Sequence, residues 1–83
     1  MKVKEYLTAI ITPILKNPNA LVIIESQDAM GVLLTMTVHK EDMGLIVGKS
    51  GETAKSIRNL VRIVGLTEGA RVSVKITEPV STG

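Results

Sequence analysis

The sequence predicts a single α+β domain with the element order α-β-β-α-α-β, in which helices cover one face of a three-stranded sheet. Two long segments carry apolar residues at helical spacing, and three short runs are β-branched or alternate between apolar and polar side chains. With 83 residues, 45% of them hydrophobic, the chain can bury one core but not two. We expect residues 1–78 to form the domain and residues 79–83 to form a flexible C-terminal tail.

The first element is predicted to be an amphipathic helix, because apolar residues recur every three or four positions from Val3 to Leu15. Pro13 interrupts this pattern, since it lacks the N–H that would bond back to Ala9. A kink or break is therefore expected near Thr12, and the Asn-Pro-Asn sequence that follows ends the element.

Two strands are predicted next, and they are joined by a turn at residues 28–31. The stretch LVIIES, residues 21–26, is short and β-branched, which indicates a buried strand. In VLLTMTVH, residues 32–39, every second side chain from Leu34 to Val38 falls on one face. Because the turn is short, the two strands are expected to form an antiparallel hairpin.

A short helix over residues 43–47 is predicted after the hairpin. Asp42 suits the N-cap position of this helix, and Glu41 and Asp42 are both favourable at the positive end of its dipole. The glycines at both ends of residues 48–51 then break the helical pattern.

The last two elements are a longer helix and a strand. The helix is expected over residues 52–64, and its apolar face consists of Ala54, Ile57, Leu60, Val61 and Val64. Residues 65–69 are expected to be a loop. The run RVSVKIT, residues 71–77, alternates cleanly and is predicted to be the third strand.

The positive charge of the chain is concentrated in one segment. The net charge is +2. The residues outside 39–62 contain equal numbers of basic and acidic side chains, so the whole excess of positive charge lies within 39–62. The basic residues of this segment are Lys40, Lys49, Lys55, Arg58 and Arg62. A small basic surface of this kind is typical of proteins that bind phosphate groups.

The composition excludes several kinds of site. Cysteine is absent, which excludes disulfides and cysteine-based metal sites and fits a reducing compartment. Tyr6 is the sole aromatic residue, so the chain cannot stack bases on aromatic side chains as many RNA-binding sheets and barrels do. The N-terminus shows neither a signal peptide nor a membrane span, and we expect a cytoplasmic protein.

Catalytic chemistry finds no support in the sequence. The single histidine, His39, has no second histidine or evident partner, and Ser50 has no neighbouring base. We therefore expect a protein that is not an enzyme, with no metal and no cofactor.

The stretch GLIVGKSGE, residues 44–52, fits more than one kind of turn. A nucleotide-binding P-loop needs four residues between its first glycine and Gly-Lys-Ser, but only three separate Gly44 from Gly48. A Gly-x-x-Gly turn between two helices accounts for more of the residues in this stretch. Its glycines allow a sugar-phosphate backbone to approach closely, and the N-terminus of the second helix attracts the phosphates. An ordinary turn between two helices is the third interpretation.

The sequence DMGLIVGKSGETAKSIRNLV resembles the core of a KH domain, whose general form is Ile/Val-Ile-Gly-x-x-Gly-x-x-Ile-x-x-Ile. The predicted element order resembles the type II, bacterial arrangement, and the whole chain is similar to the bacterial KhpA family. The resemblance implies a protein that binds single-stranded RNA and acts as an RNA chaperone or regulator. It also implies a homodimer, and a complex with a larger KH-containing, KhpB-like partner.

The resemblance assigns an RNA-binding site residue by residue. The loop that clamps about four nucleotides in KH domains falls on Gly48, Lys49, Ser50 and Gly51. The hydrophobic wall of the adjacent groove falls on Ile46, Val47 and Ile57. A basic helix face that flanks the groove is inferred from the sequence itself, because its members lie within about 60° of each other on one helix: Lys55, Arg58 and Arg62.

Three residues depart from the family pattern. Ala54 stands where the general motif has isoleucine, and Leu45 and Glu52 stand where relatives often carry arginine. Glu52 suits the start of a helix but repels a phosphate on the clamp. A protein-interaction or dimerisation module with weak or lost RNA binding is therefore the alternative function.

Overall fold

The computed structural model describes residues 2–48 and 51–77 of the chain. Its elements, in chain order, are α1 (Lys2–Ile11), the 3₁₀ turns η1 (Thr12–Ile14) and η2 (Pro18–Ala20), β1 (Val22–Asp28), β2 (Gly31–Thr37), α2 (Lys40–Val47), α3 (Glu52–Thr67) and β3 (Val72–Thr77). The predicted α+β class and the order α-β-β-α-α-β are confirmed.

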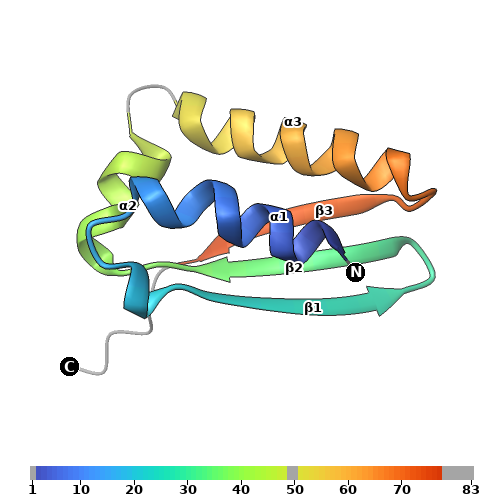
Figure 1. Cartoon of the computed structure of the whole chain (residues 1–83), viewed down its shortest axis with the longest axis horizontal. Helices are drawn as coiled ribbons and strands as arrows, with labels where there is room; N and C mark the ends of the chain where they lie inside the picture. Colours follow the sequence, from blue (N-terminus) through green and yellow to red (C-terminus); the bar gives the residue numbers. More distant parts are fainter. Residues whose placement is uncertain (1, 49–50, 78–83) are drawn as a thin grey trace.

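The three strands form one mixed sheet in the order β1-β2-β3, and the helices cover one of its faces (Figure 1). The hairpin makes β1 and β2 antiparallel, whereas β2 and β3 are parallel because the chain crosses over through α2 and α3. α1 packs against β1 and α3 packs against β3, and the two helices run in opposite directions. β3 is therefore an edge strand that lies beneath α3.

The core lies between the helix layer and the sheet. Alternate residues of β2 and β3 point into it, which is the pattern that the alternating sequences of both strands predict. Its apolar side chains are at most 8% exposed: Val3, Leu7, Ile11, Leu15, Ile23, Val32, Leu34, Met36, Val38, Ile46, Ile57, Val61, Val72 and Val74.

The predicted helix break near Thr12 is confirmed. α1 ends at Ile11, and the next three residues form the 3₁₀ turn η1 with Pro13 at its start. Leu15 then returns to an extended backbone, with φ −87° and ψ 141°. The missing N–H of proline is tolerated there, because the first positions of a helical turn have no intrahelical acceptor.

The expectation that the first strand is buried is wrong. In β1 only Ile23 lies in the core, while Val22 and Ile24 are 50% and 58% exposed. The physical reason is that β1 is an edge strand of a sheet covered on one face, so alternate side chains point away from the helices. A run of apolar residues does not by itself distinguish this arrangement from burial on both faces.

The expected loop at residues 65–69 begins too early, because α3 continues to Thr67. Gly65 makes this extension possible by lying against β3: a Cβ there would be 2.6 Å from Val72 Cγ2 and 3.1 Å from the Ala70 carbonyl oxygen. One residue of the predicted apolar face, Leu60, does not lie in the core, because its side chain is 44% exposed. The helix therefore buries a narrower stripe than its sequence suggests.

Candidate nucleic-acid interface

α2 presents one end of the candidate site, and its start differs from the prediction. The helix begins at Lys40, and His39 is its N-cap, with the imidazole Nδ1 accepting a hydrogen bond from Glu41 N at 3.0 Å. Asp42 is therefore not the cap but the third residue of the helix. The short helix itself, which ends at Val47, is confirmed.

Asp42 is 1% exposed, and it is the only buried charged side chain among the described residues. Its two carboxylate oxygens accept hydrogen bonds from Lys16 N at 2.8 Å and from Asn17 N at 3.0 Å. Burial by itself would raise the pKa of this carboxyl, but the hydrogen bonds from Lys16 and Asn17 and the nearby His39 together hold the pKa below its ordinary value of 3.8. Asp42 therefore joins α2 to the segment that follows α1.

The turn between α2 and α3 is closed by a hydrogen bond from Gly51 N to the Gly48 carbonyl oxygen at 2.7 Å. Both glycines are required by the backbone. A Cβ at Gly48 would overlap the carbonyl oxygen of Gly44, and Gly51 has a left-handed conformation with φ +64°. The two other residues predicted for the clamp, Lys49 and Ser50, lie outside the described residues.

The three apolar residues predicted for the groove wall are not equally accessible. Val47, the last residue of α2, is 48% exposed. Ile46 is completely buried and Ile57 is 4% exposed, so both belong to the core. In this structure Val47 is thus the one member of the predicted wall with substantial accessible surface.

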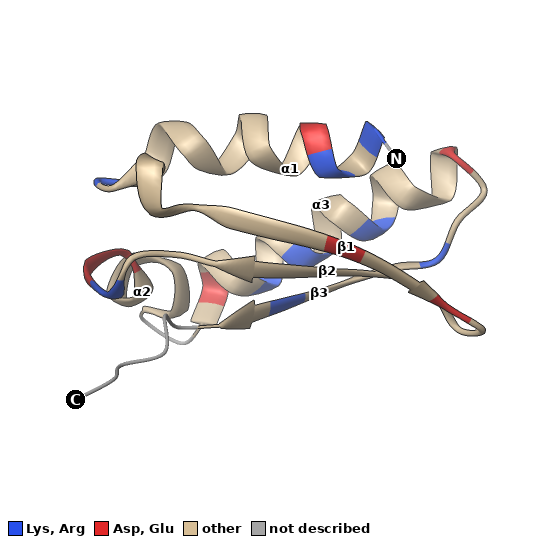
Figure 2. Cartoon of the chain, turned by 90° about the horizontal axis from the view of Figure 1, so that it is seen from below, with Lys and Arg blue, Asp and Glu red and all other residues tan. Residues whose placement is uncertain are grey.

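The basic residues predicted on α3 are exposed, and they are spread along the helix (Figure 2). Lys55, Arg58 and Arg62 lie within about 60° of one another around the helix axis. Arg62 also donates a hydrogen bond from Nη2 to Asn59 Oδ1 at 3.1 Å. This face of α3 is distinct from its buried stripe, which consists of Ala54, Ile57, Val61 and Gly65.

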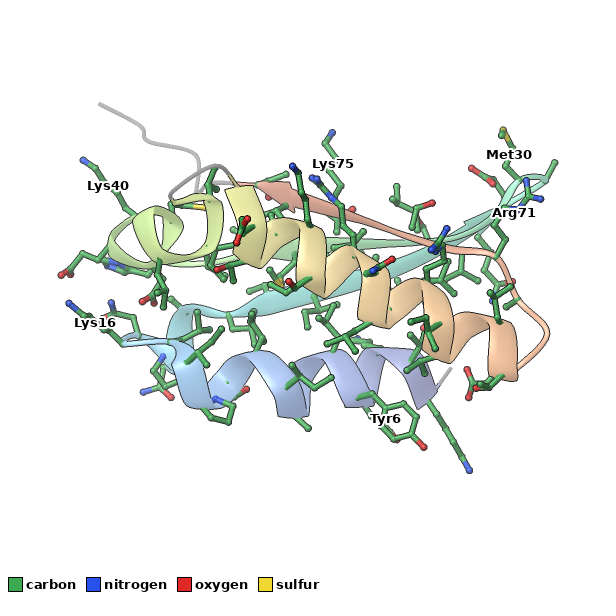
Figure 3. The ribbon with its side chains drawn as sticks, turned by 90° about the horizontal axis from the view of Figure 1, so that it is seen from above. Tyr6, Lys16, Met30, Lys40, Arg71 and Lys75 are labelled. Carbon is green, nitrogen blue, oxygen red and sulfur yellow. The ribbon has the colours of Figure 1, made fainter. Side chains whose placement is uncertain are left out.

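Sequence reasoning missed one basic residue, Lys75 of β3. Its side chain is exposed and extends from the β3 edge on the side of α3 away from α1 (Figure 3). Its polar position in an alternating strand was evident from the sequence, but the position of β3 as the edge strand next to α3 was not. The opposite edge strand, β1, carries Glu25 and Asp28 instead, so the two edges of the sheet differ in charge (Figure 2).

The geometry excludes a nucleotide-binding P-loop, which follows a β-strand. Here the glycine turn joins two helices, and residues 40–47 before it are helical. Among the residues that the structure describes, no cluster of histidine and acidic side chains could hold a metal ion. In the same residues, no helix is both long and apolar enough to cross a membrane.

A mixed three-stranded sheet, two helices joined by a Gly-x-x-Gly turn, and the order α-β-β-α-α-β together define a KH domain of the type II arrangement. Residues 4–76 match the family model described as the KH domain of KhpA and KhpB. The chain belongs to this family.

Curated bacterial relatives align over most of the chain. The RNA-binding protein KhpA of Chlamydia pneumoniae is 37% identical over 75 residues, which cover 90% of this chain and 96% of the relative. The RNA-binding protein KhpA of Bacillus subtilis is 32% identical over 73 residues, covering 88% and 90% of the two chains. Both relatives carry the name of RNA-binding proteins.

A solved structure supports the fold independently. The structure of Aquifex aeolicus Era bound to GDP and aluminium fluoride superposes with a TM-score of 0.56 at 16% identity. The match covers 92% of this chain and 28% of the Era chain. At this identity the likeness concerns the fold alone.

Proposed function

We propose that this chain binds single-stranded RNA, with Gly48–Gly51 holding the sugar-phosphate backbone and the α3–β3 side of the domain flanking the bases. Support comes from the family, whose curated members are named RNA-binding proteins. One structural observation carries the proposal further. α3 is a 16-residue helix whose N-cap is Gly51, a residue with no side chain to cap the first amides.

The physical argument concerns these first amides of α3. The first N–H groups of a helix have no intrahelical acceptor, and the helix dipole places partial positive charge there. A phosphate oxygen can accept from them, and glycines at both ends of the turn leave space for its approach. Lys55 and Arg58, exposed on the first two turns of α3, supply charge close to the same end.

Val47 is the residue that we propose to contact the bases directly. It is half exposed and directly precedes the turn. We propose that Ile46 and Ile57 shape the groove from below as core residues, and that Lys75 and Arg62 line its path along β3 and α3. Ala54 is 7% exposed, so this position offers little accessible surface to the groove.

The test is fluorescence anisotropy with a short labelled single-stranded RNA at several salt concentrations. If three or four phosphates are neutralised, the slope of log K against log salt is expected to be about −2 to −3. The variant Lys49→Asp plus Ser50→Asp should abolish binding while the domain stays folded. A matched control, Lys4→Asp plus Thr8→Asp on the exposed surface of α1, makes the same charge change and should weaken binding far less.

Equal binding by the native protein and the clamp variant would show that the turn is structural only. The alternative function would then gain support, namely a KH-fold module that docks proteins. Two exposed residues favour this alternative: Glu52 in the first turn of α3, and Leu45, which is 49% exposed. Partner binding that does not change with salt would distinguish it from RNA binding.

We also propose a homodimer, with a KhpB-like protein as a second partner and a cytoplasmic role as RNA chaperone or regulator. The outer surfaces of the helices support a dimer, because they expose Tyr6 and Ile10 on α1 and Leu60 and Ile63 on α3. Light scattering after size exclusion should give the mass of two chains for the native protein and of one chain for Leu60→Glu. A native protein with the mass of one chain would contradict the dimer.

A further inference from the structure

α2 is attached to the domain by very few side chains. It is eight residues long, and its buried side chains are Asp42 and Ile46, which are four positions apart and so lie on one face. Its other end leads into the Gly48–Gly51 turn. The partly buried Met43 also packs against the core. The orientation of the turn therefore depends on two apolar side chains and on the hydrogen bonds of one carboxylate.

The Asp42 carboxylate reaches a segment far away in the sequence. Its acceptor oxygens hold the N–H groups of Lys16 and Asn17, which precede Asp42 by 26 and 25 residues. These two residues lie between the turns η1 and η2, where their N–H groups serve no helix or strand ladder. Two short hydrogen bonds to one buried, ionised group fix both its position and its rotation.

We propose that Asp42 is a positioning residue for RNA binding: by tying α2 to the backbone of Lys16 and Asn17, it sets the place of Val47 and Gly48 relative to α3. This inference rests on the proposed function and assigns to Asp42 no contact with RNA. Loss of either hydrogen bond weakens this link and leaves α2 held more by the apolar contacts of Ile46 and Met43, so that the helix can rotate about these contacts. Val47 and Gly48 then no longer keep a fixed position relative to the start of α3.

A pair of variants at Lys16 tests the link without changing α2. Lys16→Pro removes the side-chain charge and also the backbone N–H that donates a hydrogen bond to Asp42. Lys16→Ala removes the same charge but keeps that N–H. Proline is compatible with the preceding residue, because Leu15 is extended with ψ 141°. We expect the anisotropy assay to give an RNA affinity about 2- to 30-fold lower for Lys16→Pro than for Lys16→Ala.

Asp42→Asn provides a second test, in which the effect of charge and the effect of geometry on RNA affinity have opposite signs. It removes a negative charge, and this change alone would strengthen the binding of a polyanion. Weaker binding therefore reports on geometry and not on charge. The control for lost stability is Val3→Ala, which removes packing from a completely buried position in α1 and leaves α2 unaltered.

All affinities are measured at a temperature where every variant is fully folded by circular dichroism. The proposal predicts weaker RNA binding for Asp42→Asn and Lys16→Pro, and native affinity for Lys16→Ala and Val3→Ala. If Asp42→Asn and Val3→Ala bind RNA as tightly as the native protein, Asp42 serves stability alone and the proposal is overturned.

Hydrogen exchange separates this proposal from the proposed function. If Asp42 positions the clamp, Asp42→Asn accelerates amide exchange in residues 43–48 and at Gly51 more than Val3→Ala does. A native protein that binds no RNA would refute the RNA-binding function, and the exchange result would still decide whether Asp42 holds the turn. Equal exchange in the two variants would overturn the positioning role.

Discussion

Glycine residues in the helices of this domain show how one residue type serves different physical needs. Gly65 lies in α3, and any side chain there would collide with Val72 and Ala70 of the neighbouring segment. Gly44 lies in α2 and is exposed, and a Cβ there would meet no atom within 4 Å. The structure thus gives a packing reason for the first glycine and none for the second.

Opposite effects on stability are therefore expected when each of these glycines is replaced by alanine. Gly44→Ala should raise the free energy of unfolding by about 0.5–1 kcal/mol, because alanine is the better helix former. Gly65→Ala should lower it by about 1–3 kcal/mol through overpacking against β3. Urea denaturation followed by circular dichroism measures both, and a loss of stability for Gly44→Ala would contradict the open space seen at that position.

Asp42 makes the stability of the domain depend on pH in the acidic range. Because its folded-state pKa lies below the ordinary 3.8, its stabilising contribution is complete above that pH. The contribution is lost as the pH falls through the folded-state value, since protonation removes the charge that the two N–H groups bind. Thermal unfolding between pH 6 and pH 2 should show a fall in Tm that is smaller in Asp42→Asn. An equal fall in both proteins would assign the acid sensitivity to other carboxyl groups.

At the scale of the element, α3 combines two surfaces on one helix. Its buried stripe faces the core and α3 packs on β3, while Lys55, Arg58 and Arg62 are exposed on another side of the helix. A substitution on the basic side therefore removes charge without opening a cavity. Binding and stability should separate experimentally on this helix.

The separation predicts the behaviour of single charge removals. Lys55→Ala and Arg58→Ala should each reduce the steepness of log K against log salt by about 0.7, because each removes one phosphate contact to a single strand. Their free energies of unfolding should stay within about 0.5 kcal/mol of the native value. Lys4→Ala on α1 serves as the control and should leave the slope unchanged. A slope that is unaltered in all three variants would place the RNA elsewhere.

At the scale of the whole molecule, the described elements close around one core within residues 2–77. β3, the last strand, ends at Thr77 and is joined to β2 along its full length from Val72. We therefore propose that residues 1–78 suffice for the domain. A chain that stops after residue 78 should keep the Tm and the RNA affinity of the 83-residue chain, measured by calorimetry and anisotropy. A clear drop in Tm would show that residues 79–83 contribute to the fold.

Patterns that repeat over a few residues were sufficient for much of the architecture. Alternation predicted β2 and β3, helical spacing predicted α1 and α3, and Pro13 placed the end of α1. The Gly-x-x-Gly spacing located the turn and carried the family resemblance that the comparisons confirm. These features follow from backbone geometry within one or two turns of chain, so they can be read along the sequence.

Only the tertiary structure shows which side chains are buried and which residues far apart in the sequence bind each other. Ile46 and Val47 are adjacent and equally apolar, yet one is completely buried and the other half exposed. Asp42 has the sequence signature of a cap, but its partners lie 25 and 26 residues earlier in the chain. The sequence by itself determined the order of the elements, the position of the turn and the family. The packing of helices on one face of the sheet decided that β1 is half exposed, that Lys75 lies beside α3 and that Asp42 holds α2, because each depends on segments that meet only when the chain is folded.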